Sequence, residues 1–173
     1  MGFEFTILDF IQENMRCGFL DTVLPFISRL GNKGFIWILG ASLLIVFSNK
    51  YKKHGLLILA ILLTGVIIGN LFLKNIVMRP RPCWINESVD MLTGIPKDYS
   101  FPSGHTLSSF GAATGFMYTD RRMGISALVL ALIIAFSRMY LYVHFPTDIL
   151  GGMILGTGIA LAEIYIFRRV TGD

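Results

Sequence analysis

Five apolar segments, almost free of charged residues, constrain the fold of this chain more than any other feature. They cover residues 34–48, 55–73, 106–118, 124–142 and 147–167. An α-helix needs about 20 apolar residues to cross the hydrocarbon core of a bilayer. Residues 55–73 and 147–167 approach that length, and the shorter segments can extend into their flanks. We therefore expect an all-α, polytopic membrane helix bundle with about five to six transmembrane helices.

The composition also favours a single membrane domain. Of the 173 residues, 54% are hydrophobic and 15% are charged, whereas soluble domains carry about 25% charged residues. The net charge of +4 is small and dispersed. Because the chain has no basic stripe interleaved with aromatic residues, we expect no nucleic-acid partner. We expect residues 1–173 to form one integral-membrane domain, with residues 34–173 as its helical core.

Residues 1–33 differ from this core and are predicted to form an N-terminal amphipathic, interfacial region. Residues 3–16 place apolar side chains at helical spacing, with acids and amides between them, which is typical of a helix lying in the membrane interface. Residues 19–30 contain Pro25 and Arg29 and are too short to span the bilayer, so re-entrant or interfacial packing is favoured. Helices that cover the bundle, or a sixth span, are the alternatives.

Two repeats of small residues indicate close packing between helices. Gly65 and Gly69 form a GxxxG motif, and Gly152, Gly156 and Ala160 place a small residue at every fourth position. Small residues let the backbones of membrane helices approach each other. We therefore assign neither pattern a role in catalysis.

The two cysteines, Cys17 and Cys83, do not have the spacing of a metal site. We interpret them as two unrelated thiols. A disulfide between them is the alternative if both face an oxidising compartment.

Charged residues in the loops orient the helices in the membrane. Lysine and arginine gather at three helix ends: Lys50, Lys52, Lys53, Arg121, Arg122, Arg168 and Arg169. The positive-inside rule makes these ends cytoplasmic. By alternation, the N-terminal stretch, the long 74–104 connection and the 138–147 turn lie on the extracytoplasmic side. A connection of about thirty residues in so compact a chain is itself an indication of function.

The first polar cluster covers residues 74–82, where the second apolar segment ends. Lys74 and Arg81 are separated by six residues, and two prolines stiffen the end of the cluster. An ammonium and a planar guanidinium can converge on the oxygens of a phosphate. The alternative is a basic flank that snorkels toward the lipid headgroups. We interpret Arg79, between them, as such a flank or loop anchor.

The second cluster covers residues 102–105, where the third apolar segment begins. Ser103 is a candidate N-cap, and the N-terminus of a helix presents backbone N–H groups to an anion. Gly104 lets the backbone approach a ligand. His105 is suited to donate a proton to a departing alkoxide. A helix start with a satisfied histidine is the alternative.

The third cluster covers residues 137–148, between the fourth and fifth apolar segments. It contains Arg138, and then His144 and Asp148 four residues apart, with Pro146 near the start of the fifth helix. A carboxylate next to an imidazole fixes its tautomer and stabilises its cation. This arrangement suits a histidine whose other nitrogen attacks phosphorus. A structural pair that holds a tight turn is the alternative.

Together, the three clusters resemble the three-part signature of the type 2 phosphatidic acid phosphatase superfamily, which includes membrane lipid phosphatases and soluble vanadium haloperoxidases. The matching residues are Lys74-x6-Arg81-Pro82, Pro102-Ser103-Gly104-His105 and Ser137-Arg138-x5-His144-x3-Asp148. All three parts match without a gap or a substitution. The departure from the family is in size, since many relatives have six spans and this chain has five clear ones.

The resemblance implies hydrolysis of a phosphomonoester or diphosphate through a phosphohistidine, with no metal and no cofactor. It makes His144 the expected nucleophile, Asp148 its orienting partner and His105 the general acid. The residues expected to hold the phosphoryl oxygens are Lys74, Arg81, Ser103, Gly104 and Arg138.

The resemblance thus predicts a small bacterial lipid phosphatase of the plasma membrane, with its active site on the extracytoplasmic side. Undecaprenyl pyrophosphate is the expected substrate, and phosphatidylglycerophosphate or phosphatidic acid is the alternative. The spanning segments argue against a haloperoxidase. A non-enzymatic lipid-headgroup binder or transporter is an alternative of another class, but it would not need two histidines and an aspartate together.

Overall fold

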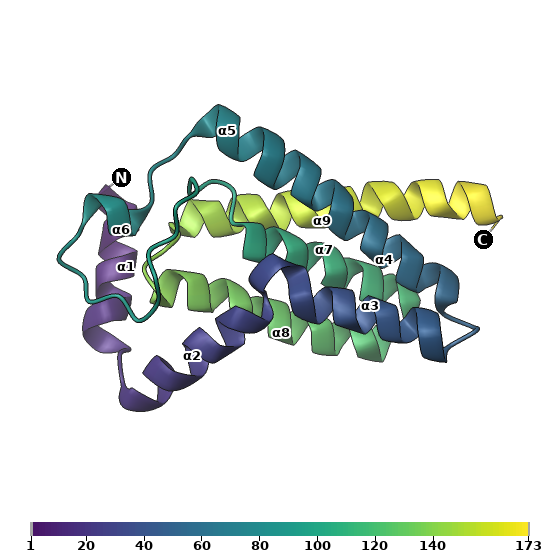
Figure 1. The fold of residues 1–173 in the computed structure, drawn as a ribbon, viewed down its shortest axis with the longest axis horizontal. Helices are drawn as coiled ribbons and strands as arrows, with labels where there is room; N and C mark the ends of the chain where they lie inside the picture. Colours follow the sequence, from purple (N-terminus) through teal and green to yellow (C-terminus); the bar gives the residue numbers. More distant parts are fainter. Residues whose placement is uncertain (1, 173) are drawn as a thin grey trace.

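The computed structural model describes residues 2–172 of the protein, and in that range every regular element is a helix (Figure 1). In chain order the elements are α1 (Gly2–Asn14), α2 (Gly18–Leu30), η1 (Asn32–Gly34), α3 (Phe35–Phe47), α4 (Lys52–Gly65), η2 (Val66–Leu73), α5 (Lys74–Val77), α6 (Pro82–Ile85), α7 (Gly104–Thr119), α8 (Arg121–Tyr140) and α9 (Pro146–Thr171). Element η1 is a short 3₁₀ turn, and η2 is a π-helical stretch. The all-α prediction is confirmed.

Helix α7 forms the centre of the bundle. It packs against α8, α9 and α4, and most of its residues are buried. The main core joins α3, α4, α7 and α8 around Trp37, Ile58, Phe116 and Ile134. Because α7 is enclosed, residues at its N-terminus are held inside the bundle.

Glycines allow α7 to lie very close to its neighbours. A Cβ atom on Gly156 of α9 would lie 2.3 Å from the carbonyl oxygen of Leu107, and one on Gly152 would lie 2.8 Å from that of Ser103. A Cβ atom on Gly65 or Gly69 would lie 2.5 Å from the Leu107 side chain. The predicted role of both small-residue repeats in close helix packing is confirmed.

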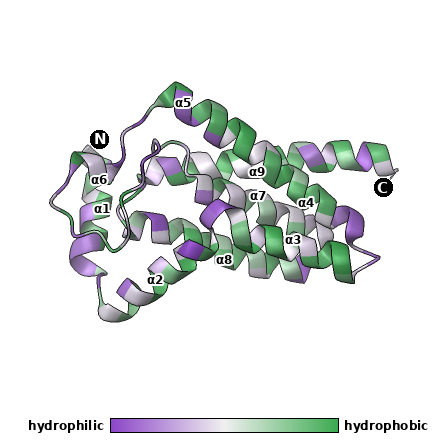
Figure 2. Ribbon diagram, in the orientation of Figure 1, coloured by the Kyte–Doolittle hydropathy of each residue, from purple (hydrophilic) through white to green (hydrophobic). Residues whose placement is uncertain are grey.

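The outer surface of the long helices is apolar. Large hydrophobic side chains such as Leu63, Phe72 and Ile154 are exposed, and Figure 2 shows hydrophobic residues covering the long helices while hydrophilic residues gather toward the ends and loops. Within residues 2–172, three stretches are long and apolar enough to cross a membrane: Lys52–Ile85, α8 and α9. Exposed apolar surface of this extent suits lipid contact.

The first helices add a fourth candidate span. Helix α2 and the segment Asn32–Phe47 pass the same test together, although the chain bends by 48° between them. Such a bent pair is either a broken span or a re-entrant loop, and the second of these is one of the two arrangements predicted for residues 19–30. The structure has three or four candidate spans, whereas we expected five to six. The segment 34–48 qualifies only together with α2, and α7, with 16 residues, is shorter than a span.

The two ends of the bundle differ in character. The α3–α4 turn and the C-terminus of α9 lie at one end, and α1, α6 and the 86–103 loop lie at the other (Figure 1). Helix α1 runs across this second end. The two cysteines are both free, with Cys17 exposed and Cys83 buried, in agreement with two unrelated thiols.

We expect even one added methyl group at the α7–α9 crossing to destabilise the protein. Gly156→Ala should lower the free energy of unfolding by about 1–3 kcal/mol, because the new Cβ must displace backbone rather than a flexible side chain. Gly158→Ala on the same helix is the matched control, since nothing lies within 4 Å of its Cβ position, and helix propensity favours alanine there. Thermal unfolding in detergent measures both, and equal midpoints would contradict the close crossing.

Candidate active site

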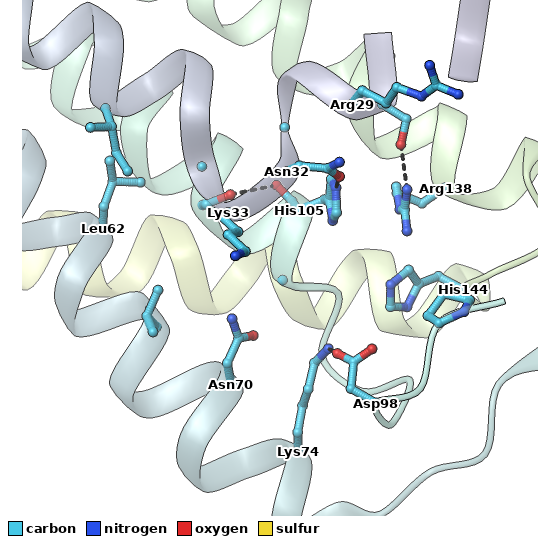
Figure 3. Close-up of a pocket in the computed structure, with 18 of the residues that line it drawn as sticks. Arg29, Asn32, Lys33, Leu62, Asn70, Lys74, Asp98, His105, Arg138 and His144 are labelled. Carbon is cyan, nitrogen blue, oxygen red and sulfur yellow. Dashed lines mark hydrogen bonds and ion pairs between the residues drawn. The ribbon is translucent and has the colours of Figure 1, made fainter. Parts of the chain in front are cut away.

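A cavity of about 730 Å³ lies between α2, η1, α4, η2 and the 86–103 loop (Figure 3). Six of the eight residues predicted for the site line it: Lys74, Arg81, Gly104, His105, Arg138 and His144. The other two, Ser103 and Asp148, are fully buried next to it. The fold therefore brings together the three clusters that the sequence separates.

The π-helical stretch η2 carries the chain from α4 to Lys74. Segments of π-helix are rare and frequently occur at functional sites. The run ends at Met78, whose φ of 46° is left-handed, and this turn directs the following residues toward the 86–103 loop. Lys74 is buried, and its ammonium is hydrogen-bonded to the carboxylate of Asp98.

Arg81 is the most highly connected side chain of the cavity. Its Nε and Nη1 donate to the carbonyl oxygens of Asp98 and Val143, both at 2.7 Å, and Nη1 also lies 3.1 Å from His144 Nε2. Its Nη2 donates to Asp98 Oδ1 at 2.8 Å. A guanidinium has five donors in a fixed plane, so these bonds leave Arg81 with little freedom to move.

Asp98 is a component of the site that the sequence analysis did not identify. Its carboxylate bridges Lys74 and Arg81, although its side chain is 57% exposed. Burial alone would raise the pKa of Asp98, but the hydrogen bond from Lys74 and the charge of Arg81 outweigh it and lower that pKa to about 2. A carboxylate thus lies where two cations converge, which is the position expected for an anionic ligand.

The geometry of His144 distinguishes its two nitrogens. Nδ1 lies 3.5 Å from Asp148 Oδ2, and Nε2 faces Arg81 on the cavity side. Because arginine only donates hydrogen bonds, the contact with Arg81 places the lone pair on Nε2 and the proton on Nδ1. Burial, followed by the charges of Arg81 and Arg138, lowers the pKa of His144 well below its ordinary value. A neutral imidazole therefore presents an unprotonated nitrogen to the cavity.

The turn between α8 and α9 holds this pair in place. Tyr142 has a left-handed φ of 56°, and Pro146 begins α9 in the position that proline favours. The backbone N–H of Phe145 donates to Asp148 Oδ2 at 2.8 Å, and the hydroxyl of Ser100 donates to the same oxygen. Asp148 therefore both caps α9 and orients His144.

Arg79 is not a basic flank that snorkels to the headgroups; it anchors its loop, which was the other role that we expected, and it does so through two ion pairs. Its Nη1 lies 2.7 Å from Asp148 Oδ1, and its Nη2 lies 2.5 Å from Glu4 Oε2 of α1. Its guanidinium also stacks over the ring of Phe145, 4.2 Å from the centroid. Asp148 is fully buried, so Arg79 provides the counter-charge that its carboxylate needs.

His105 stands at the start of α7, as predicted. Ser103 is the N-cap of this helix, because its hydroxyl oxygen accepts hydrogen bonds from Thr106. His105 Nε2 lies 2.9 Å from Asn32 Oδ1. Since an amide oxygen only accepts, this contact places a proton on Nε2. The proton therefore points toward η1 and the cavity.

Arg138, in the last turn of α8, is buried and donates to the hydroxyl of Ser28 on α2. Its Nε has no hydrogen-bond partner among the described residues. An unsatisfied buried donor of this kind is costly. It marks a place where an anionic ligand would complete the site.

The chemistry of the cavity is that of an anion site. Within residues 2–172, no group of three or more His, Cys, Asp or Glu side chains is arranged to hold a metal ion. The charged groups that converge are instead Lys74, Arg81 and Arg138 (Figure 3). The unprotonated Nε2 of His144 can attack an anion bound between these cations, and the protonated Nε2 of His105 can donate a proton to it.

Comparisons with known proteins agree with this chemistry. The model of the PAP2 superfamily matches residues 53–171. The chain is 29% identical over 167 residues to an undecaprenyl-diphosphatase of Sulfolobus acidocaldarius, covering 96% of this chain and 79% of that protein. It is 32% identical over 160 residues to phosphatidylglycerophosphatase B of Bacillus subtilis, covering 82% and 72%.

The fold is also similar to a solved structure. The crystal structure of a transmembrane PAP2-type phosphatidylglycerolphosphate phosphatase from Bacillus subtilis superimposes with a TM-score of 0.76 at 26% identity. The match covers 95% of this chain and 86% of that one. The predicted membrane helix bundle is thereby confirmed.

We expect Arg79 to stabilise the site through its ion pair with Asp148. Arg79→Met should lower the free energy of unfolding by roughly 3 kcal/mol, because a buried carboxylate loses its partner. Arg169→Met, which removes an exposed arginine stacked on Tyr165, is the control. Denaturation in detergent measures both changes. The Arg79–Asp148 ion pair would be contradicted if Arg79→Met lowered the free energy of unfolding by as much in an Asp148→Asn background as in the unaltered protein.

Proposed function

The chain belongs to the PAP2 superfamily, and on this premise we propose that His144 attacks the phosphate of a membrane lipid. The protein is a membrane-embedded lipid phosphatase, as the family and its relatives establish. The observation that carries the proposed mechanism is the geometry of His144, whose unprotonated Nε2 faces the cavity while Nδ1 faces Asp148.

The first step transfers the phosphoryl group to the enzyme. The lone pair of His144 Nε2 gives up its hydrogen bond from Arg81 Nη1 and forms a bond to phosphorus, while the bond from phosphorus to the leaving oxygen breaks. The imidazole becomes cationic, and the carboxylate of Asp148, 3.5 Å from Nδ1, stabilises that charge. The low pKa of His144 keeps its nitrogen available for attack at neutral pH.

His105 completes this step as the general acid. Its Nε2 proton, directed at Asn32, passes to the leaving oxygen when a substrate displaces that contact. In the second step His105 takes a proton from water, and the resulting hydroxide oxygen attacks the phosphohistidine. The bond from phosphorus to His144 breaks, and inorganic phosphate leaves.

The cations hold the transferred group. Lys74, Arg81 and Arg138 neutralise charge on the phosphoryl oxygens. Ser103 and Gly104 place the first turn of α7, with its backbone N–H groups, beside them. Asp98, which bridges Lys74 and Arg81, is displaced by the phosphate. No step requires a metal or another cofactor.

We assign undecaprenyl pyrophosphate as the substrate, with phosphatidylglycerophosphate or phosphatidic acid as the alternative. The undecaprenyl-diphosphatase of Sulfolobus acidocaldarius aligns with almost the whole chain, and phosphatidylglycerophosphatase B of Bacillus subtilis supports the alternative. The cavity also has an apolar part, suited to a lipid tail, lined by Ile38 of α3 and by Leu59, Leu62, Leu63 and Val66.

We propose that the active site faces the extracytoplasmic side of the plasma membrane. Its end of the bundle carries α1 and the 86–103 loop, whereas the turn with Lys50, Lys52 and Lys53 lies at the opposite end (Figure 1). The positive-inside rule assigns that opposite end to the cytoplasm.

A substrate panel tests the activity and its nucleophile. The purified protein in detergent and EDTA should release phosphate from a prenyl diphosphate, and phosphatidylglycerophosphate and phosphatidic acid serve as competing substrates. His144→Ala should remove this activity and the acid-labile phosphoenzyme that rapid quenching traps, because no other nitrogen replaces Nε2. No phosphate release from any of these lipids would refute the assigned activity.

The matched control is His54→Ala, at the opposite end of the bundle. His54 contacts the rings of Tyr51, Tyr118 and Phe167 and does not line the cavity. The His54→Ala variant should keep the turnover per folded molecule of the unaltered protein. Wild-type activity in His144→Ala would end the phosphohistidine mechanism.

Cysteine labelling tests the orientation. In a Cys17→Ser background, Glu87→Cys on the exposed part of the 86–103 loop should react with a membrane-impermeant maleimide added to intact cells. Lys53→Cys, at the opposite end, should react only after permeabilisation. The reverse pattern would overturn the assigned side of the active site.

A further inference from the structure

A cation that the reaction does not use lines the cavity on the far side of His105. Lys33, in η1, lines the same cavity as the catalytic groups. In Figure 3 its ammonium points into the cavity toward Asn70, whereas the guanidinium of Arg29 points away. Among residues 2–172, no hydrogen bond, ion pair or ring contact engages the Lys33 side chain. Its charge is therefore free to meet a ligand.

The backbone at Lys33 is unusual for a lysine. Its φ of 52° is left-handed, and so is the φ of 72° at the following Gly34. Residues with a side chain rarely adopt this region, which glycine enters at little cost. Unfavourable backbone of this kind is concentrated at ligand sites. A lysine here, next to a glycine, places an ammonium at the mouth of the cavity at some cost in conformational energy.

The neighbours of Lys33 place it on the leaving-group side of the reaction. The preceding residue, Asn32, accepts the proton of His105 Nε2 at 2.9 Å, so the leaving oxygen must come to this part of the cavity. Asn70 of η2 faces it, and a Cβ atom on Gly104 would lie 2.8 Å from Asn70 Oδ1. The absence of a side chain on Gly104 therefore leaves room for the Asn70 amide beside the start of α7.

The apolar part of the cavity continues beyond Lys33. Leu62, on the wall of that part, lies on the same side of the site as Lys33, and His144 lies on the other (Figure 3). A lipid with its tail at Leu62 and its terminal phosphate at His144 must pass between Lys33 and Asn70. Any charged group between tail and terminal phosphate would then face the Lys33 ammonium.

We propose that Lys33 and Asn70 form a second anion-binding position, which holds the lipid-attached phosphate of a diphosphate substrate. His144 bonds to the terminal phosphorus, and the bond from that phosphorus to the bridging oxygen breaks. The bridging oxygen leaves with the lipid monophosphate and takes the proton of His105. Lys33 neutralises the charge that stays on the lipid side, and Asn70 donates to its oxygens.

This assignment rests on the proposed phosphatase mechanism and narrows its substrate to lipid diphosphates. A lipid monophosphate places nothing charged at Lys33, because its leaving group is an alcohol. Lys33 also lies outside residues 53–171, which the family model matches. Asn70, the other residue of this position, lies inside that segment, so substrate selection combines one residue outside the matched segment with one inside it.

Steady-state kinetics with a matched pair of substrates tests the proposal. A prenyl diphosphate and the prenyl monophosphate with the same tail are compared in the same detergent. Lys33→Met should lower kcat/KM for the diphosphate by roughly tenfold or more, since it removes one charge-assisted contact. The kcat/KM for the monophosphate should stay within about threefold, because that substrate does not reach Lys33.

Three further variants separate binding from folding. Lys33→Gly suits the left-handed backbone and should show the same selective loss, whereas Lys33→Arg should recover most of the diphosphate activity. Lys53→Met replaces an exposed lysine at the opposite end of the bundle and should leave kcat/KM unchanged for both substrates. Equal losses on both substrates, or no loss on the diphosphate, would overturn the second anion position.

The activity of the unaltered protein on the two prenyl substrates distinguishes a failure of this proposal from a failure of the proposed function. Hydrolysis of the monophosphate alone would overturn the diphosphate assignment and leave the phosphatase mechanism standing. Hydrolysis of neither lipid would overturn both.

Discussion

The bonds of the Arg81 guanidinium are the interactions on which the rest of the site depends. They reach the backbone of the 86–103 loop, the carbonyl oxygen of Val143 and the ring of His144. The 86–103 loop and the turn at residues 143–144 are therefore both held to the segment of Arg81 by one planar group with five donors. The same group determines that His144 Nε2 carries the lone pair. Without it, the loop would lose its anchor and the nucleophile would lose its defined tautomer.

Several of the charges buried in the bundle are paired with an opposite charge. Asp98 bridges Lys74 and Arg81, and Arg79 joins Asp148 to Glu4. Asp148 is fully buried while Asp98 is largely exposed, and this difference separates their roles. A buried pair is expensive to break, so Arg79 and Asp148 form a permanent frame. An exposed carboxylate can move aside, so Asp98 can yield its place to a phosphate.

Short-range patterns were sufficient to predict the components of the site, but not their partners. The cap at Ser103, the spacing of His144 and Asp148, and the apolar segments each depend on neighbours within a few residues. The contacts of Asn32 with His105 and of Ser28 with Arg138 join residues 73 and 110 positions apart. No local pattern distinguishes such residues from ordinary loop or helix positions. The partner of Arg79 was missed for the same reason, because Asp148 lies 69 positions away. Apolar content also does not give the length of a helix, so it did not show that α7 has only 16 residues.

Several of the long-range partners come from one part of the chain. Glu4, Ser28 and Asn32, which contact Arg79, Arg138 and His105, all belong to the first 34 residues, before the 53–171 segment that the family model matches. Within that segment lie the nucleophile, the acid and the three cations. The N-terminal helices instead contact Arg79, Arg138 and His105 from outside. Phosphoryl transfer constrains the nucleophile, the acid and the three cations tightly, because their charges must match one transition state. Among the N-terminal residues, Lys33 is the one proposed to face the part of the substrate that differs between lipids. A change at Lys33 can therefore alter which lipid is accepted while the catalytic groups stay the same.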